Sequence, residues 1–155
     1  MLARFAALAL TALFVGCAAV AQPAPDPVTW ESRTLGKITY DVEAGPYGVL
    51  KYETVFGDNI GLLFIDGLAG EFGGPGPLKG FWTESDVSHD DDDDNTLICP
   101  VTVNDDYGRT TRNWGRLIIA FTSDDFPTDF VLMRGRCFED PTDVISGKLV
   151  KQLRR

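Results

Sequence analysis

Histidine and cysteine are scarce in this sequence, whose 155 residues include one histidine and three cysteines. A Ser-His-Asp triad and a multi-histidine zinc site both need histidine, so either one must use His89. The sequence also has no Cys-x-x-Cys pair, no glycine-rich phosphate loop and no Gly-x-Ser-x-Gly motif. These absences argue against thiol-redox and nucleotide-dependent enzymes. Because His89 stands among aspartates in a polar segment, we expect it to be an exposed loop residue.

A long hydrophobic run is also missing. The apolar stretch 5–16 is shorter than the roughly 20 residues that a membrane span requires. Arg4 precedes it, and an Ala-Val-Ala motif ends at Ala21. This order is typical of a secretory signal peptide, so we expect cleavage after Ala21 and a periplasmic or secreted protein without a transmembrane segment. Cys17, which follows a small residue, leaves a second possibility open, a lipoprotein signal with a lipid anchor at Cys17.

Basic residues are outnumbered, with 14 lysines and arginines against 23 aspartates and glutamates and a formal net charge of -9. A chain this acidic repels nucleic acid and anionic lipid headgroups, so we predict neither as a partner. Loss of the signal peptide would remove Arg4 and no acidic residue, which makes the mature protein more acidic still. Charge therefore favours basic proteins or divalent cations as partners.

After cleavage only two cysteines remain, Cys99 and Cys137, and in an oxidising compartment we expect them to form a disulfide. The predicted turns place Cys99 opposite Trp114 and Cys137 opposite Gly115, on strands that flank a shared neighbour. Two strand spacings amount to about 9.5 Å, whereas a disulfide rarely spans more than about 6.8 Å between Cα atoms. Either the strands diverge near Gly115 or this register is wrong.

The mature chain shows no convincing helical periodicity, and glycines and prolines punctuate it at short intervals. This pattern predicts an all-β protein. We expect residues 22–29 to be a proline-rich tether and residues 30–155 to form a single β domain. About eight antiparallel strands in meander order would close a small up-and-down β-barrel of the lipocalin or avidin kind, and a two-sheet β-sandwich is the alternative. The later strands are expected at 96–104, 113–121, 130–137 and 144–149.

Side-chain parity predicts the register of the earlier strands. Turns near residues 45–47, 57–59 and 73–77 set Tyr40 opposite Tyr52, Tyr52 opposite Phe64, and Leu68 opposite Trp82. Even-numbered residues would then face the core in all four strands. Odd-numbered apolar residues between 61 and 72 suggest that this strand is buried locally on both sides.

Parity directs Asp66 into the core, where a carboxylate needs a partner such as Arg134 or Arg136. A structural ion pair is the favoured interpretation, and ligand binding or catalysis by Asp66 are the alternatives. Aromatic side chains, Tyr52 and Trp82 among them, could line a ligand cup within the barrel. We expect a filled core instead, and name Asp66, Tyr52 and Trp82 as the candidate ligand-binding residues.

An acidic run, comprising Asp86 and residues 90–94, surrounds His89. Clustered carboxylates can bind calcium, and Asp90, Asp92 and Asp94 are weak calcium candidates. The run lacks the ligand spacing and the glycine of an EF-hand loop. We therefore expect a solvated loop, no metal site and no cofactor.

Between Gly80 and Gly147 the chain carries Gly-Phe-Trp, Cys99, Trp-Gly-Arg at 114–116 and Gly-Arg-Cys at 135–137. This pattern resembles small secreted bacterial β-rich proteins of uncharacterised function. The resemblance implies a β scaffold and no particular activity.

The sequence thus favours a non-enzymatic binding module that recognises a small apolar ligand, or a protein through its rim loops. An inhibitor of a secreted hydrolase is one alternative. A second is a carboxylate-dependent hydrolase built on Asp66, which would need another acidic group nearby. A third is a cell-envelope interaction protein with no small ligand.

Overall fold

The computed structural model describes residues 27–54, 60–69, 76–85, 98–105, 108–123 and 126–150. The predicted signal peptide, the Cys17 anchor and the acidic run with its calcium candidates Asp90, Asp92 and Asp94 lie outside these residues. The described part contains no helix that is long and apolar enough to cross a membrane. Its ten strands are β1 (Thr29–Ser32), β2 (Gly36–Ala44), β3 (Tyr47–Glu53), β4 (Ile60–Asp66), β5 (Leu78–Glu84), β6 (Val103–Asn104), β7 (Thr110–Thr111), β8 (Trp114–Phe121), β9 (Phe130–Arg134) and β10 (Asp143–Leu149).

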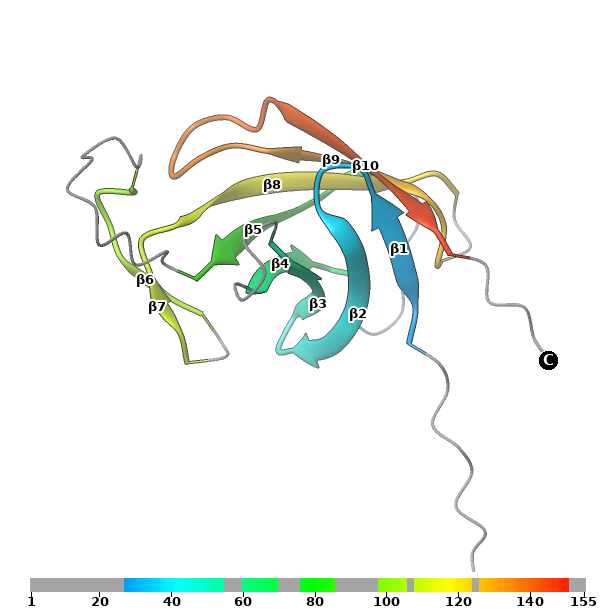
Figure 1. Ribbon diagram of the computed structural model, residues 1–155, viewed down its shortest axis with the longest axis horizontal. Coiled ribbons are helices and arrows are strands. Elements are labelled where there is room, and N and C mark those ends of the chain that lie inside the picture. Colours follow the sequence, from blue (N-terminus) through cyan, green and yellow to red (C-terminus); the bar gives the residue numbers. More distant parts are fainter. Residues whose placement is uncertain are drawn as a thin grey trace, which may run out of the picture.

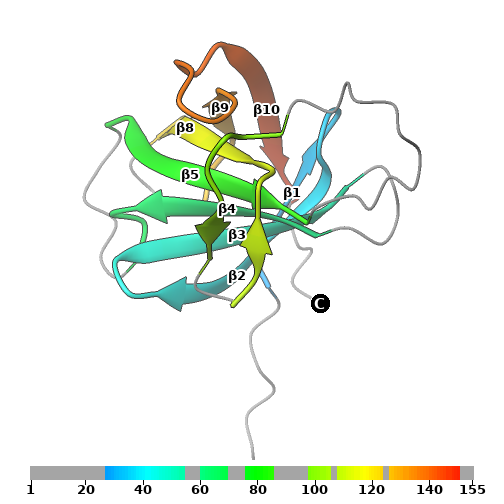
Figure 2. The ribbon, with the colours of Figure 1, turned by 90° about the vertical axis from the view of Figure 1, so that its left-hand side faces the viewer.

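Eight of these strands close into an antiparallel β-barrel (Figure 1). Strands β1 to β5 and β8 to β10 follow one another around it in chain order, and β1 closes the barrel by pairing with β10. The predicted all-β meander barrel is therefore confirmed, and the sandwich alternative is wrong. Strands β6 and β7 form a separate hairpin that crosses in front of β3, β4 and β5 in Figure 2.

The fifth barrel strand is not the predicted one. Of the described part of the segment expected at 96–104, residues 98–104, only Val103–Asn104 is a strand, and it pairs with β7 outside the barrel. Pro100 has no amide proton to donate, which makes this segment a poor central strand, and β5 pairs directly with β8 instead. The barrel still has eight strands, because β1, which was not predicted, completes it. Trp30 of β1 pairs with Ile38 on one side and with Leu149 on the other.

The predicted parity holds for β3 and β5 but is wrong for β4. Tyr52 pairs with Gly61 rather than Phe64, and Trp82 pairs with Leu63 rather than Leu68. The β3–β4 connection spans residues 54–59, longer than the turn assumed, and an odd shift in register exchanges the two faces of a strand. Odd-numbered residues of β4 therefore point into the barrel. The strand is buried on both sides, as predicted.

The first hairpin also departs from the expected register. Tyr40 pairs with Leu50 rather than Tyr52, and a β-bulge interrupts the ladder between Tyr40 and Val42. The shift before the bulge is even, so Tyr40 still shares the inner face with Tyr52. A bulge of this kind sharpens the bend and twist of a strand, as barrel closure requires.

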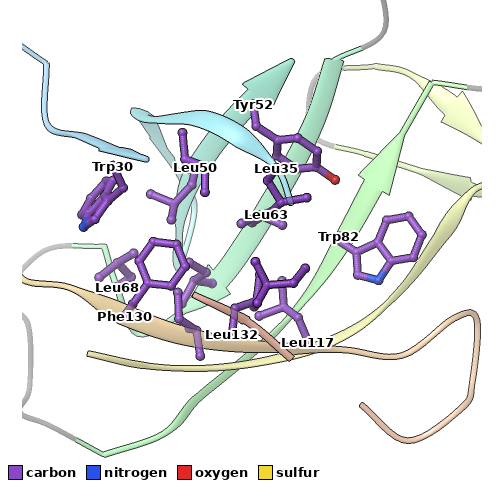
Figure 3. Close-up of a cluster of buried hydrophobic side chains, with 14 of the residues drawn as sticks. Trp30, Leu35, Leu50, Tyr52, Leu63, Leu68, Trp82, Leu117, Phe130 and Leu132 are labelled. Carbon is purple, nitrogen blue, oxygen red and sulfur yellow. The ribbon is translucent and has the colours of Figure 1, made fainter. Parts of the chain in front are cut away.

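Apolar side chains from all eight barrel strands pack together inside the barrel (Figure 3). The buried members of this cluster are Trp30, Leu35, Ile38, Leu50, Tyr52, Leu63, Ile65, Leu68, Trp82, Leu117, Ile119, Phe121, Phe130, Leu132 and Ile145. The expected filled core is therefore present. A smaller cluster of Val49, Leu62 and Phe64 lies on the outer side of β3 and β4.

Candidate functional site

Two of the three predicted ligand-binding residues meet at one end of the barrel, where β3, β5 and β9 end. Tyr52 on β3 reaches across β4 toward β5, and Figure 3 shows it and Trp82 on the same side of the core. The crossing depends on Gly61, because a side chain at this position would overlap the Tyr52 ring. On β4, which lies between β3 and β5, a glycine at position 61 thus leaves room for the Tyr52 ring to reach Glu84.

A hydrogen-bond network joins Tyr52, Glu84 and Arg134 at this end. The Tyr52 hydroxyl donates to Glu84 Oε1 at 2.6 Å. Arg134 Nη1 donates to Glu84 Oε1 at 3.2 Å and to the Tyr52 oxygen at 3.1 Å. Asn113 Nδ2 donates to Glu84 Oε2 at 3.2 Å. Both carboxylate oxygens of Glu84 are therefore engaged by donors from β3, β9 and the residue before β8.

Trp82 supports the arginine of this network. The Arg134 guanidinium lies over the Trp82 ring, with its Cζ 5.0 Å from the ring centroid, an arrangement that favours a cation. The Trp82 indole donates to the Gly135 carbonyl at 2.9 Å. Arg134 Nη2 is 3.7 Å from the exposed Asp143, while its buried Nε has no acceptor among the described residues. Side chains from β3, β5 and β10 thereby contact one guanidinium, which β9 supplies.

Burial raises the pKa of Tyr52 well above its ordinary value of 10.0, and the nearby Glu84 raises it further, although Arg134 acts in the opposite direction. Tyr52 is therefore a protonated hydrogen-bond donor at physiological pH. The Glu84 side chain is 23% exposed, but its oxygens are already paired. The network closes this end of the barrel as a polar seal and offers no free base.

Asp66 does not join this site. It is the last residue of β4, it is exposed, and it pairs across the strands with Tyr47. The predicted inward orientation and the ion pair with Arg134 or Arg136 are wrong, because the register of β4 is shifted by an odd number of residues. The carboxylates near Arg134 are those of Glu84, at 3.2 Å, and Asp143, at 3.7 Å. Sequence reasoning did not single out Glu84, since only the correct β3–β4 and β4–β5 registers place it across from Tyr52.

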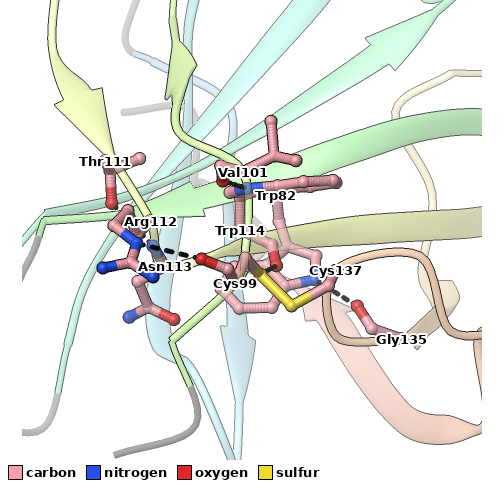
Figure 4. The surroundings of a disulfide bond; sticks show 9 residues. All are labelled: Trp82, Cys99, Val101, Thr111, Arg112, Asn113, Trp114, Gly135 and Cys137. Carbon is pink, nitrogen blue, oxygen red and sulfur yellow. Dashed lines mark hydrogen bonds between the residues drawn. A yellow bond between two sulfur atoms is a disulfide. The ribbon is translucent and has the colours of Figure 1, made fainter.

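The predicted disulfide forms at the rim of the same end (Figure 4). Cys99 and Cys137 are joined with their Cα atoms 5.4 Å apart. Beyond the end of β9 the chain leaves the ladder, and Cys137 makes an isolated parallel bridge to Gly115. A side chain at Gly115 would collide with the Gly135 carbonyl, so glycine permits this close approach. Both predicted alternatives apply: the chain leaves the ladder near Gly115, and the predicted register is wrong, because β5 and not the Cys99 segment pairs with β8.

Exposed apolar side chains surround this disulfide. Ile98 and Val101 flank Cys99, Phe138 follows Cys137, and their exposed fractions are 50%, 46% and 54%. Trp114 lies beneath them, and its indole donates to the Val101 carbonyl at 2.7 Å. Its ring meets the Phe138 ring edge-on, with the two ring centroids 5.0 Å apart. We call Ile98, Val101, Trp114 and Phe138, with the disulfide under them, the disulfide platform.

The β6–β7 hairpin beside the platform has its own attachment to the barrel. Arg109 forms an ion pair with the buried Asp105 at 2.7 Å, and it donates to the Ile60 carbonyl at 2.8 Å and to the Thr83 hydroxyl at 2.8 Å. Thr111 donates to the Glu84 carbonyl at 2.7 Å. The segment that carries Ile98 and Val101 is therefore attached at two places, by the disulfide at Cys99 and by the Arg109–Asp105 ion pair in the hairpin that follows it.

Within the described ranges, no three histidine, cysteine, aspartate or glutamate side chains are grouped so as to hold a metal ion. Comparison of the chain with protein-family models, with curated proteins and with solved structures finds no match. Fold and local chemistry alone therefore bear on function.

Proposed function

We propose that this protein is a non-enzymatic binding module, periplasmic or secreted, that docks another protein on its disulfide platform. The observation that carries the proposal is the packed interior. Side chains from all eight strands occupy the space that a lipocalin-like barrel would give to a ligand. A small apolar ligand would have to displace this core, whereas a protein partner can bind the outside.

The platform has the features of a protein-binding hot spot. Such surfaces combine tryptophan, other aromatic residues and arginine around a rigid centre. Here Phe138 is half-exposed, Trp114 supports it, and Arg116 lies over its ring with Cζ 5.9 Å from the centroid. The disulfide fixes both loops that carry the exposed side chains, which lowers the entropy that is lost on binding.

The same disulfide favours an oxidising compartment, in agreement with the expected signal peptide. The hydrolase alternative was built on an inward-facing Asp66 and has lost that support. An inhibitor of a secreted hydrolase is a narrower form of the present proposal, in which the partner is the hydrolase.

The test compares capture of partners by three forms of the protein, each purified with its disulfide formed and immobilised at equal density. Phe138→Asp places a charge on the platform, and Val42→Asp places one at a similarly exposed valine on β2, 43% exposed, as the matched control. Extracellular and envelope fractions of the source organism are passed over all three. We expect a partner that binds the parent and Val42→Asp and is lost with Phe138→Asp. Equal retention by Phe138→Asp would contradict the proposal, and so would the absence of any protein that binds the parent.

A further inference from the structure

The disulfide lies outside the strand ladder of the barrel. Cys99 precedes β6 and Cys137 follows the end of β9, so neither cysteine belongs to a barrel strand. The barrel is closed by the pairing of β1 with β10, in which the disulfide takes no part. Cleavage of the disulfide would therefore leave the ladders of the barrel in place and act first on the two loops that carry the disulfide platform.

Cys99 is held in the fold by more than the disulfide. It is fully buried, its amide donates to the Arg112 carbonyl at 2.9 Å, and its carbonyl accepts from Arg112 Nε at 3.0 Å. Its Sγ lies 3.2 Å from the Trp114 carbonyl oxygen (Figure 4), which can accept a hydrogen bond from a thiol. Cys99 therefore has a place in the fold as a reduced cysteine.

Cys137 depends on the disulfide more strongly. It is partly exposed, and its φ of 52° is the one positive φ of a non-glycine residue within the described ranges. A residue with a Cβ avoids this left-handed conformation, which persists only where the surroundings impose it. Apart from the disulfide, the Cys137 amide donates to the Trp114 carbonyl at 2.9 Å. After cleavage this one amide bond would have to hold Cys137 in its left-handed conformation.

We propose that the disulfide is a redox switch of the docking surface, an inference that rests on the proposed function of the platform. The reductant is a dithiol, the chemical group that thiol–disulfide oxidoreductases carry. One of its thiolates attacks the sulfur of Cys137, since Cys99 is buried, and the electron pair of the S–S bond passes to Cys99 Sγ, which takes up a proton. The second thiol of the reductant then displaces the Cys137 thiolate, which is protonated, and the reductant leaves as a disulfide. Two electrons and two protons have then passed to this protein.

Reduction would change one half of the platform. Cys99 keeps its other partners, so its side of the platform stays in place. Cys137 relaxes from its left-handed conformation and displaces Phe138, the next residue, whose ring is 54% exposed and meets Trp114 by an edge contact and Arg116 at 5.9 Å. The oxidised protein thus presents the complete platform, and the reduced protein lacks its exposed aromatic ring. A thiol–disulfide change of this kind acts as a switch because it biases one local element while the rest of the fold is kept.

The experiment compares the oxidised protein with the same protein reduced by millimolar dithiothreitol, and mass spectrometry after alkylation counts the free thiols. Amide NMR spectra and partner capture are recorded for both forms. We expect unchanged far-UV circular dichroism, shifted or broadened amide signals at residues 136–138 and a smaller change at Cys99. Partner capture should fall by about tenfold or more, as for loss of a hot-spot residue, and reoxidation should restore it.

Two double variants separate the left-handed conformation from the covalent link. Cys99→Ser with Cys137→Ser has no disulfide and should behave as the reduced protein does. Cys99→Ser with Cys137→Asn is the matched control, because asparagine enters the left-handed region more readily than serine. We expect this control to retain more of the oxidised amide spectrum at residues 136–138 and more of the partner capture.

Four results would overturn the proposal. They are a disulfide that dithiothreitol does not reduce in the folded protein, loss of the barrel on reduction, unchanged amide signals at residues 136–138, and equal behaviour of the two double variants. If the oxidised parent captures no partner, the docking proposal fails, and the amide signals still decide whether reduction releases Phe138.

Discussion

The two ends of the barrel are closed by different chemistry. At the end where β8 turns into β9, four aromatic rings pack against one another, those of Trp30, Phe121, Phe126 and Phe130. The Trp30 indole satisfies its single donor by bonding to the Thr128 carbonyl at 2.7 Å. Apolar closure of this kind requires only burial and shape.

The opposite end is closed by polar groups that satisfy one another. Tyr52, Glu84 and Arg134 form a network in which each depends on the other two, and the rim outside it carries the disulfide. A polar seal is stable only when its members are paired. From this comparison we expect that removing a buried ring at the aromatic end costs more stability than removing one polar group of the seal, and that the polar end fixes the geometry of the surface that we propose for docking.

The largest effect is expected at the aromatic end. Trp30→Ala should lower the free energy of unfolding by about 3–5 kcal/mol, because it leaves a cavity among fully buried rings. Urea denaturation of the oxidised protein measures this loss. Val131→Ala, on the exposed face of the same barrel, is the control and should change stability by less than about 0.5 kcal/mol. A loss of less than about 1 kcal/mol for Trp30→Ala would contradict the expectation that the aromatic end contributes more to stability than the polar end.

The next effect concerns the disulfide of the polar end. Replacing Cys99 and Cys137 together by serine opens a link with a sequence separation of 38 residues, which should cost about 2–5 kcal/mol. Hydrogen exchange should show faster opening of residues 98–101 and 135–138 than of the aromatic end. Uniformly faster exchange over the whole barrel would mean that the disulfide serves global stability and not the platform in particular.

A smaller loss is expected for Tyr52→Phe, which removes one donor to Glu84 and keeps the ring. We expect a destabilisation of about 1–2 kcal/mol in chemical denaturation. Tyr40→Phe is the matched control at a half-buried tyrosine, and its effect should be clearly smaller. If the two variants lose the same free energy, the polar seal has no special role.

Alkaline pH should act on the same residue. Since the pKa of Tyr52 in the folded protein lies well above 10.0, its contribution to stability is fully present below pH 10 and is lost as pH rises beyond it, where tyrosine in the unfolded chain ionises. Stability measured against pH should therefore fall more steeply above pH 10 in the parent than in Tyr52→Phe. Identical slopes for the two proteins would contradict this assignment.

The smallest effect on stability is expected on the platform itself. Phe138→Ser should change the free energy of unfolding by less than about 0.5 kcal/mol, because the ring is more than half exposed. Its effect should appear in partner capture alone. A destabilisation above about 1 kcal/mol in thermal or urea melts would show that Phe138 belongs to the folding core of this end.

The fold was accessible from the sequence, and the site only in part. Alternation and turn residues predicted the meander barrel, and two remaining cysteines predicted the disulfide. The connection before β4 is longer than predicted, and the observed register of β4 differs from the predicted one by an odd number of residues. Asp66 therefore lies at the surface, and Glu84 lies across from Tyr52. An odd error in the register of one strand turns all of its side chains to the opposite face. A carboxylate and its arginine can therefore be paired from the sequence only when the length of every turn between them is known. Tyr52 and Trp82 were found because a buried aromatic residue on β3 or β5 faces the core regardless of the register of β4.

The central claim is that this barrel works through its outer surface and not as a container. The most direct measurement is titration of the oxidised protein with a fluorescent fatty acid, read by energy transfer from its tryptophans, with unfolding followed in parallel. The account predicts no saturable binding, because Trp30, Tyr52 and Trp82 are packed within the interior. Stoichiometric binding to the folded protein, weakened by Trp82→Phe and unaffected by Phe138→Asp, would contradict it.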